Sequence, residues 1–340
     1  MRLLIVTQVV DAKDPILGFF VRWLEEFSKH AEQIEVVCLK EGTHSLPANV
    51  RVHSLGKEKG VSRMKYIFNF YTYIWELRQQ YDTVFVHMNP EYLLLGGLFW
   101  RLAGKKIGFW YNHPHAGIRL RIAAQLSNKV FFTSPFAASA TFPHAKRMPA
   151  GIDTDVFKPQ PVPYDRQSLY MQGRVMPSKH LAVALEALQI LRKTISAKLI
   201  LVGPEDPTYG ESLRIRFSDL VESGAVVFAG PKRNDETPPY YAAAGGSINL
   251  ASAGHFDKSV LESMACETPV ITSSPAFVDI ISSEWVVKEN DPPALAATLE
   301  RLIMFPEAEY HALKKTLRAR VVASHSLREL GIRLFAEMNI

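Results

Sequence analysis

The chain contains, at residues 252–273, the stretch SAGHFDKSVLESMACETPVITS, in which a polar, glycine-containing loop leads into a short helix and then a buried strand. We expect the helix to begin near Asp257 and to carry Glu262, and the strand to cover residues 269–271. Backbone N–H groups and the positive end of a helix dipole favour phosphates, and a carboxylate one turn along accepts hydrogen bonds from ribose hydroxyls. The pattern therefore predicts a ligand with phosphates and a ribose, with an ordinary helix start as the alternative.

A second stretch, SLYMQGRVMPSKH at residues 168–180, predicts a strand that ends at Gly173 and a loop that holds Arg174 and Lys179. Arg binds a diphosphate through two parallel hydrogen bonds, whereas Lys acts as a point charge. Two cations in one loop are often only a solvated basic surface. Together with residues 252–273, however, they favour a diphosphate site.

Seven motifs in a fixed order carry a resemblance to a known family. They are LLIVTQVVDAKDPILGFF (3–20), IGFWYNH (107–113), GIDTDVF (151–157), GRVMPSK (173–179), LILVGPE (199–205), VVFAGPKRND (226–235) and SVLESMACETPVIT (259–272). This order resembles the retaining, family-4 type glycosyltransferases of glycosyl transferases group 1, which have the GT-B fold. The resemblance covers nearly the whole chain and implies an α/β protein of two doubly wound, Rossmann-like domains that face a central cleft.

Hydrophobic patterning agrees with that architecture, because short apolar runs alternate with amphipathic segments, as in parallel α/β sheets. We expect strands at 3–7, 34–39, 83–86, 107–110, 130–132, 168–172, 198–202, 226–228, 247–250 and 269–271, and first-half helices near 18–30, 62–80, 91–103 and 116–126. The proline-rich stretch KPQPVPY (158–164) is the clearest linker. The expected division is an N-terminal acceptor-binding domain at 1–157, a C-terminal nucleotide-sugar-binding domain at 164–322 and, from the resemblance, a helix at 323–340 that crosses back to the first domain.

Length and composition limit the class of protein. With 340 residues, 47% hydrophobic and 21% charged, the chain can form two cores and is not disordered. The net charge of +5 is mild, and no nucleic-acid-binding pattern accompanies it. No apolar run is long enough to span a membrane, and the first residues are expected to form a strand rather than a signal peptide. Cys38 and Cys266 are expected to be reduced core thiols, which suits the cytoplasm.

The resemblance assigns roles to individual residues on the donor side. Arg174 and Lys179 match the family's diphosphate-binding pair, and Glu262 matches the second acidic residue of its E-x₇-E motif, which resembles a ribose ligand. We therefore expect a catalytic set and a donor-binding set. The catalytic set is His113, Arg174, Lys179 and Glu262, and the donor-binding set is Gly18, Arg174, Lys179, Lys232, Asp257, Lys258, Ser259, Val260 and Glu262.

The chain departs from the family at the first acidic position of this motif, which is Gly254. In the family that carboxylate contacts the transferred sugar, so its absence implies either a weakened enzyme or another residue in its role. Asp257 and Lys258 are the expected substitutes, and the ordinary structural role of Asp257 would be to cap the helix. Glu267 stands where the family usually has Gly, and we expect this surface-turn change to be neutral.

On the acceptor side, Gly18 resembles the family's glycine loop that approaches the phosphates, although a plain turn is equally consistent. His113, which we expect after a strand extended through Asn112, matches the family's histidine near the transferred sugar. His87 and His115 are expected to contact the acceptor or to support the site. A lone histidine is otherwise more often a structural hydrogen-bonding residue.

No convincing Asp-x-Asp metal motif lies near the end of an expected strand, so we expect no metal and no cofactor. Charge on the leaving group would then be met by Arg174, Lys179 and helix N-termini. The family resemblance implies the same metal-free arrangement, retention of anomeric configuration, and a leaving phosphate that helps to deprotonate the acceptor. The expected donor is a UDP- or GDP-type nucleotide-diphosphate sugar.

Residues 57–80 mix basic and aromatic side chains, which suits a helix in a membrane interface near a lipid-linked acceptor. The alternative is a helix that packs a stripe of Ile67, Phe70, Tyr71 and Ile74 on the first sheet. Taken together, the sequence predicts a glycosyltransferase acting on a glycan or lipid-linked acceptor in cell-envelope assembly, in the cytoplasm or at the cytoplasmic face of a membrane. A non-hydrolysing sugar-nucleotide epimerase and a sugar-nucleotide-binding pseudoenzyme remain the alternatives.

Overall fold

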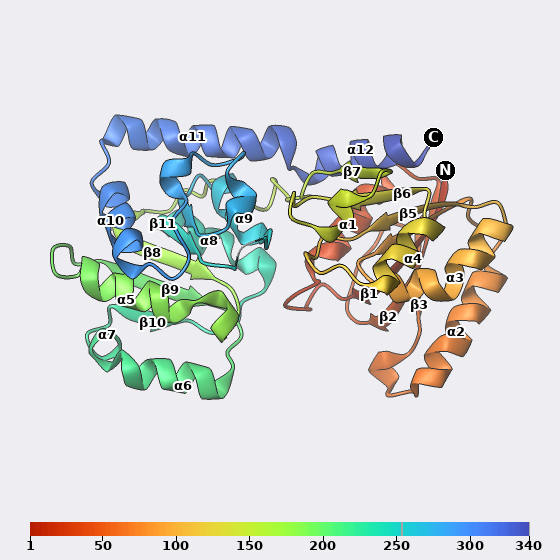
Figure 1. The fold of residues 1–340 in the computed structure, drawn as a ribbon, viewed down its shortest axis with the longest axis horizontal. Helices are drawn as coiled ribbons and strands as arrows, with labels where there is room; N and C mark the ends of the chain where they lie inside the picture. Colours follow the sequence, from red (N-terminus) through yellow and green to blue (C-terminus); the bar gives the residue numbers. More distant parts are fainter. Residues whose placement is uncertain (253, 340) are drawn as a thin grey trace. The chain divides into compact units, whose positions relative to one another are not determined.

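The computed structural model describes residues 1–252 and 254–339, which form two compact α/β units (Figure 1). Unit 1 comprises Met1–Gly151 together with the segment that begins at Leu327, and unit 2 comprises Ile152–Ser326. The division falls just ahead of the proline-rich stretch 158–164, which lies within unit 2. The predicted α/β fold class, with two parallel sheets, is confirmed.

Unit 1 contains a seven-stranded parallel sheet in the order β3-β2-β1-β4-β5-β6-β7. Its strands are β1 (Arg2–Val10), β2 (Gln33–Glu41), β3 (Val50–Ser54), β4 (Thr83–His87), β5 (Lys106–Trp110), β6 (Lys129–Phe132) and β7 (Ala145–Arg147). The chain moves outward from β1 to β3 and then returns to pair β4 with the other side of β1. This reversal makes β1/β4 the topological switch point of the sheet.

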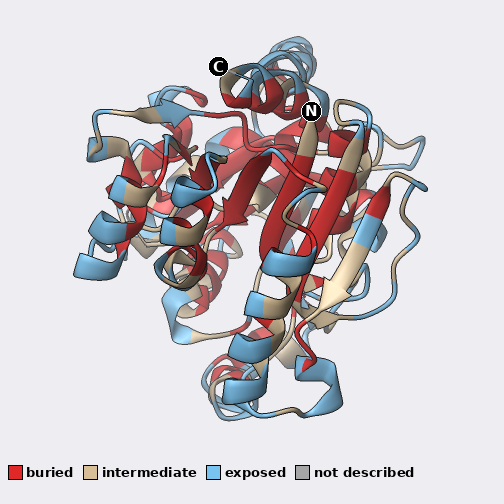
Figure 2. Ribbon diagram, turned by 90° about the vertical axis from the view of Figure 1, so that its right-hand side faces the viewer, coloured by how far each residue is buried: buried red, intermediate tan, exposed pale blue. Residues whose placement is uncertain are grey.

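Helices cover both faces of the unit 1 sheet. One face carries α1 (Phe19–Ser28) and α12 (Leu327–Met338), and the other carries α2 (Arg63–Glu76), α3 (Pro90–Leu102) and α4 (Ile118–Leu126). In β1, Leu3 and Ile5 join the first core and Leu4 and Val6 the second, because successive side chains of a strand point to opposite faces. The central strands are accordingly buried on both sides (Figure 2).

Unit 2 contains a five-stranded parallel sheet in the order β10-β9-β8-β11-β12. Its strands are β8 (Asp165–Gln172), β9 (Lys198–Val202), β10 (Val226–Phe228), β11 (Ala244–Asn249) and β12 (Val270–Thr272). The chain runs from β8 outward to β10 and then crosses back to place β11 on the other side of β8. The switch point of this sheet is therefore β8/β11.

The helices of unit 2 are α5 (Leu181–Leu191), α6 (Pro207–Arg216), α7 (Ser218–Glu222), α8 (Pro238–Ala243), α9 (Lys258–Ala265), α10 (Pro292–Ile303) and α11 (Glu307–Ser324). β11 shows how they divide between the faces. A Cβ on Gly246 would meet Leu302 of α10, whereas the Ser247 hydroxyl bonds the Ser263 hydroxyl of α9 at 2.6 Å. Helices α10 and α9 thus cover opposite faces of this sheet.

Some boundaries differ from the sequence-based expectation. The short edge strands β3 and β7 were not predicted, and β5 ends at Trp110 instead of continuing through Asn112. The extension is wrong because the Asn112 carboxamide accepts hydrogen bonds from the backbone N–H groups of Thr133 and Ser134, which turns the chain into a loop. The helix expected over 62–80 covers only 63–76. Within the described residues, no helix combines the length and the apolar character that crossing a bilayer requires.

Candidate functional site

The polar residues predicted at the two key stretches meet at the switch point of unit 2. The loop after β8 carries Arg174 and Lys179, and the loop after β11 leads to Asp257 and the start of α9. Because β8 and β11 are neighbours in the sheet, their carboxyl ends place these loops side by side. In open α/β sheets, ligands bind at this position.

The loop after β8 is held by a close backbone approach. A Cβ on Gly203, which follows β9, would lie 2.0 Å from the carbonyl oxygen of Gly173, so this contact requires a glycine. Just beyond, Val175 and Glu205 form an isolated parallel bridge. The loop that carries Arg174 and Lys179 is therefore anchored to the neighbouring loop.

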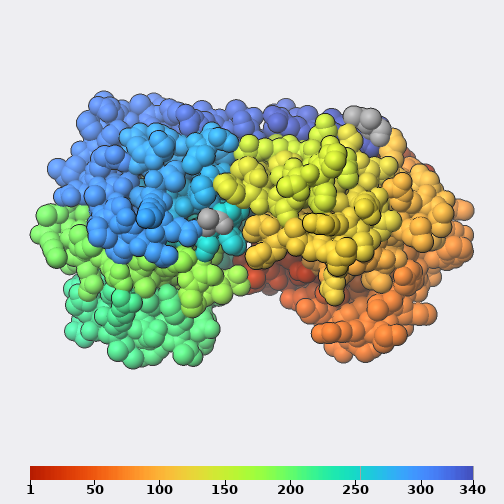
Figure 3. Space-filling view, viewed as in Figure 1, coloured from red at the N-terminus to blue at the C-terminus, as the bar shows by residue number. Residues whose placement is uncertain are grey.

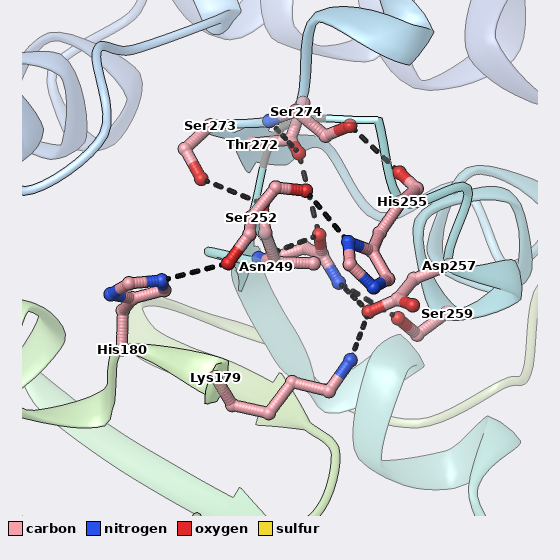
Figure 4. A network of polar contacts seen from close by, with 11 residues as sticks. Lys179, His180, Asn249, Ser252, His255, Asp257, Ser259, Thr272, Ser273 and Ser274 are labelled. Carbon is pink, nitrogen blue, oxygen red and sulfur yellow. Dashed lines mark hydrogen bonds and ion pairs between the residues drawn. The ribbon is translucent and has the colours of Figure 1, made fainter. Parts of the chain in front are cut away.

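Lys179 forms an ion pair with Asp257, so the structure brings together two residues that lie 78 positions apart (Figure 4). Only 18% of the Lys179 side chain and 23% of the Asp257 side chain are exposed. Asn249, the last residue of β11, donates from Nδ2 to the same Asp257 Oδ2 at 3.1 Å and to Ser259 Oγ at 3.2 Å. The lysine, the aspartate and the start of α9 are thereby linked.

Asp257 occupies the N-cap position of α9, but its side chain makes no capping hydrogen bond to that helix. The capping role considered from the sequence is wrong, because Oδ2 instead receives the Lys179 ammonium and the Asn249 amide. Lys258 is the first residue of α9 and is half-buried, while Val260 is fully buried in the core. Among these α9 residues, Asp257 and Ser259 take part in the network around Asn249.

Glu262 lies one turn into α9, as predicted, and only 5% of it is exposed. Its Oε1 accepts from Asn234 Nδ2 at 3.0 Å, and its Oε2 lies 3.4 Å from the hydroxyl of Tyr241, which also bonds the Ser259 carbonyl. Burial, followed by the charge of Glu262, raises the pKa of Tyr241 well above its ordinary value. Tyr241 therefore stays a protonated donor to the carboxylate.

Arg174 and Lys232 are exposed in the loops that follow β8 and β10. In residues 1–252 and 254–339, neither side chain makes an ion pair or a side-chain hydrogen bond. The positive charge of Lys179 is thus balanced by Asp257. The charge of Arg174 is exposed to solvent and has no acidic partner among the described residues. That difference was not evident from the sequence, which treats both as cations of one loop.

The unit 1 residues occupy three different settings. Gly18 precedes α1 with a right-handed backbone, and a Cβ there would meet the Asp14 carbonyl at 2.6 Å, so close packing explains this glycine. His87 is 4% exposed, stacks on Phe20 at a centroid distance of 4.4 Å, and lies 3.2 Å from Thr7 Oγ1 through Nδ1. This histidine is part of the core, and burial leaves it little surface for contact with an acceptor.

His113 and His115 lie in the loop after β5. Nδ1 of His113 accepts the backbone N–H of His115 at 3.3 Å, and the two rings are 4.8 Å apart. His115 is exposed and His113 is half-buried. A role for His113 near a transferred sugar stays a prediction from the family resemblance.

Two backbone conformations bear on the departures from the family pattern. Gly254 is buried with a φ of +87°, a left-handed conformation that glycine adopts more easily than any other residue. Glu267 follows α9 with a φ of +59°. A helix C-terminus in this conformation favours glycine, so the backbone argues for a cost of Glu267 in place of the neutral change expected from the sequence.

Sequence reasoning missed Asn249, Asn234 and Tyr241, which hold the acidic residues of the site. Asn249 had a usable signal, since it is a polar residue at the carboxyl end of a buried strand. In the part of the chain that the structure describes, no cluster of three or more His, Cys, Asp or Glu side chains could hold a metal ion. Cys38 and Cys266 are free and buried, and burial raises the pKa of Cys38 to about 12.

Residues 166–304, which span the unit 2 sheet and the site on it, match the family described as Glycosyl transferases group 1. This segment belongs to the glycosyl transferases group 1 family. The group 1 segment contains Arg174, Lys179, Asp257 and Glu262, and so includes the whole switch-point network.

Curated relatives are similar over part of their length. The D-inositol 3-phosphate glycosyltransferase of Acidothermus cellulolyticus is 28% identical over 177 residues, covering 46% of this chain and 40% of the relative. The GDP-mannose-dependent alpha-(1-6)-phosphatidylinositol monomannoside mannosyltransferase of Mycolicibacterium smegmatis is 28% identical over 233 residues, covering 60% of each chain. The chain thus spans about half the length of these relatives.

Solved structures support the fold over the whole chain. The Anabaena protein HepE, in a structure with UDP, superposes with a TM-score of 0.80 at 15% sequence identity and covers 100% of both chains. At this identity the similarity establishes the fold alone. It confirms the GT-B architecture expected from the sequence.

Proposed function

We propose that this protein is a retaining glycosyltransferase that moves a sugar from a UDP- or GDP-type donor to a glycan or lipid-linked acceptor in cell-envelope assembly. The observation that carries the proposal is the meeting of Lys179, Asp257 and the start of α9 at the switch point of a group 1 segment. UDP in the HepE structure, and the GDP-mannose and phosphatidylinositol monomannoside in the name of the Mycolicibacterium smegmatis relative, support this donor and acceptor class.

The switch-point residues suit the binding of a nucleotide diphosphate. Arg174 is exposed and able to bind phosphate oxygens through two hydrogen bonds, and the N-terminus of the eight-residue helix α9 adds backbone N–H donors. Glu262, held by Asn234 and Tyr241, is a fixed carboxylate that can accept from ribose hydroxyls. Each group can stabilise a bound nucleotide, and Arg174 also opposes the charge that grows on a leaving diphosphate.

The transfer itself is proposed to need no metal and to keep the anomeric configuration, as in the family that the sequence resembles. Arg174 and the α9 N-terminus would supply the positive charge that a metal ion supplies elsewhere, and the Lys179 ammonium, paired with Asp257, would add a hydrogen-bond donor. The leaving phosphate would accept the proton of the acceptor hydroxyl. Activity should persist in excess EDTA, and loss of activity that magnesium or manganese restores would contradict this part of the proposal.

The lipid-linked acceptor is proposed from an exposed apolar surface on unit 1. Helices α2 and α3 are neighbours, since the Tyr71 hydroxyl bonds the Leu95 carbonyl at 3.0 Å and Trp75 lies 6.1 Å from Phe99 (Figures 1 and 3, orange). Large apolar side chains on three helices remain exposed. They are Met64, Phe68, Tyr71 and Trp75 on α2, Leu94, Leu98 and Leu102 on α3, and Ile118 and Ile122 on α4.

The net positive charge of the chain is concentrated in the segment that carries α2, α3 and α4. Residues 57–125 contain ten Lys and Arg against four Asp and Glu, whereas the rest of the chain holds 29 against 30. Apolar side chains beside basic ones favour the surface of an anionic membrane. The predicted packing stripe is narrower than expected, because Phe70 and Ile74 are buried while Ile67 and Tyr71 are 36% and 44% exposed.

Vesicle sedimentation tests the membrane contact. The protein should sediment with vesicles that contain phosphatidylglycerol and less with neutral phosphatidylcholine vesicles. The double variant Phe68→Ser/Trp75→Ser should lose this binding, while Ile215→Ser, which replaces a side chain 70% exposed on α6, should keep it. Equal binding by both variants would contradict a docking role for α2.

Thermal shift with UDP, GDP and their sugar conjugates tests the donor class, because a ligand that binds the folded state raises the apparent stability. A shift with one nucleotide and its sugar, followed by NMR of the anomeric configuration of the product, would support the proposed reaction. A pseudoenzyme would bind the nucleotide sugar without transferring it. An epimerase would instead convert the free sugar nucleotide with no acceptor present.

A further inference from the structure

We infer that Asn249 and Asp257 are positioning residues that hold the ammonium group of Lys179 at the start of α9. The inference rests on the proposed function, since it assigns a task within the proposed donor site. Figure 4 shows the three side chains arriving from the end of β11, the start of α9 and the loop after β8.

Lys179 needs an external partner to be fixed in place. Its ammonium lies at the end of a flexible four-carbon chain, and ordering such a side chain costs up to about 2 kcal/mol of conformational entropy. It ends the short 3₁₀ turn Pro177–Lys179, and the next residue, His180, has a φ of +49°. Asp257 is the residue that fixes the ammonium, through its Oδ2.

Asn249 fixes Asp257 in turn. It is 4% exposed and pairs in register with Thr272 of β12, so the sheet determines its position. Its Oδ1 lies 3.4 Å from both Thr272 Oγ1 and the Ala251 backbone N–H, which leaves Nδ2 to donate to Asp257 and Ser259. A buried amide with partners on both ends is a rigid support.

The arrangement changes the role expected for Asp257. A carboxylate that replaced the family's sugar ligand would use its oxygens for sugar hydroxyls, but Oδ2 is already shared by Lys179 and Asn249. The ion pair between Lys179 and Asp257 also links the loop after β8 to the start of α9. Removal of Asp257 or Asn249 should therefore act on nucleotide binding through Lys179.

Lysine acetylation measures the position of Lys179 without any ligand. The full chain is treated with a trace of acetic anhydride, and the modification of Lys179 and of exposed Lys232 is quantified by mass spectrometry. Lys179 should react slowly in the native protein, and Asp257→Asn and Asn249→Ser should each raise its rate at least threefold while Lys232 stays unchanged. Ser259→Ala removes only the other partner of Asn249 Nδ2. This variant is the matched control and should leave the acetylation rate of Lys179 unchanged.

Calorimetric titration with UDP or GDP then measures the consequence. Asp257→Asn and Asn249→Ser should each weaken binding about fivefold, but less than twofold when Lys179 is already Met, because the support then has nothing to hold. Equal losses in both backgrounds, tighter binding by Asp257→Asn, or an unchanged acetylation rate of Lys179 would each overturn the inference. Absence of nucleotide binding in the native protein would refute the proposed function, while the acetylation result would still decide the positioning role.

Discussion

The two sheets place very different residues at their switch points. In unit 1, His87 ends β4 beside β1 and is buried against Phe20 and Trp23. In unit 2, the ends of β8 and β11 lead to Lys179 and Asp257, which are partly exposed and charged. The same topological position is thus filled by an aromatic core in one unit and by an ionic network in the other.

This difference separates stability from ligand binding. Aromatic packing contributes apolar burial and fixed geometry but no charge. A partly exposed ion pair contributes little to stability, commonly below about 1 kcal/mol, yet it sets the electrostatics of a site. Substitutions at the unit 1 position should therefore affect folding, and those at the unit 2 position should affect ligands.

Of the substitutions that test this comparison, Trp23→Ala should have the largest effect, a loss of folding stability. Trp23 is 1% exposed, contacts Trp110 at a centroid distance of 5.2 Å, and donates to the Gly151 carbonyl at 3.0 Å. Its removal should lower the free energy of unfolding by about 3–5 kcal/mol in urea titration. Trp75→Ala, at a Trp that is 58% exposed, should change the free energy of unfolding by less than about 0.5 kcal/mol. Similar losses of stability in Trp23→Ala and Trp75→Ala would show that burial of the aromatic core does not determine the stability of unit 1.

Arg174→Ala should impair transfer and nucleotide binding at the unit 2 switch point without unfolding the protein. The loss of a charge that faces the leaving diphosphate should slow transfer by ~10²-fold, equivalent to about 2.7 kcal/mol, and should weaken UDP or GDP binding. The melting temperature should stay within about one degree, because Arg174 makes no side-chain hydrogen bond within the described residues. Normal turnover in Arg174→Ala, with Lys193→Ala as control, would mean that the donor site is misplaced.

Glu267→Gly should stabilise the protein, in contrast to most substitutions. Glu267 has a φ of +59°, which strains a residue with a Cβ, and relief should raise the free energy of unfolding by roughly 0.5–1 kcal/mol. Glu267→Ala separates geometry from charge, because it removes the carboxylate and keeps the Cβ. If the Ala variant gains as much as the Gly variant, backbone strain is not the cause.

Glu205→Gln should have the smallest effect, and it should depend on pH. Arg214 donates to Glu205, with 2.8 Å between Nη2 and Oε2, and this hydrogen bond lowers the pKa of the carboxyl below its usual 4.5. The stabilisation is therefore present above that usual value and is lost as pH falls through the lower folded-state pKa. The variant should be less stable than the native protein by about 0.5 kcal/mol at pH 7, and this difference should shrink as pH falls below 4.5; a difference that grows on acidification would contradict this.

The sequence predicted the sheets well because their strands are continuous apolar runs, and buried parallel strands need no other signal. It failed at β3 and β7, which are short edge strands with exposed residues. Within the site, Arg174, Lys179 and Glu262 could be placed by their motifs. Their contacts could not, because Lys179 pairs with Asp257, 78 positions away, and Glu262 accepts from Asn234, 28 positions away.

The last helix has a consequence for the order in which the protein can fold during synthesis. Leu330, Leu334 and Phe335 of α12 belong to the same core as Phe20 and Trp23, although more than 300 residues separate them in sequence. A ribosome that has made residues 1–151 has therefore produced a unit 1 that lacks part of its apolar interior. Unit 2 is continuous in sequence and can therefore fold first. Unit 1 exposes part of its apolar core until residues 327–338 have left the ribosome.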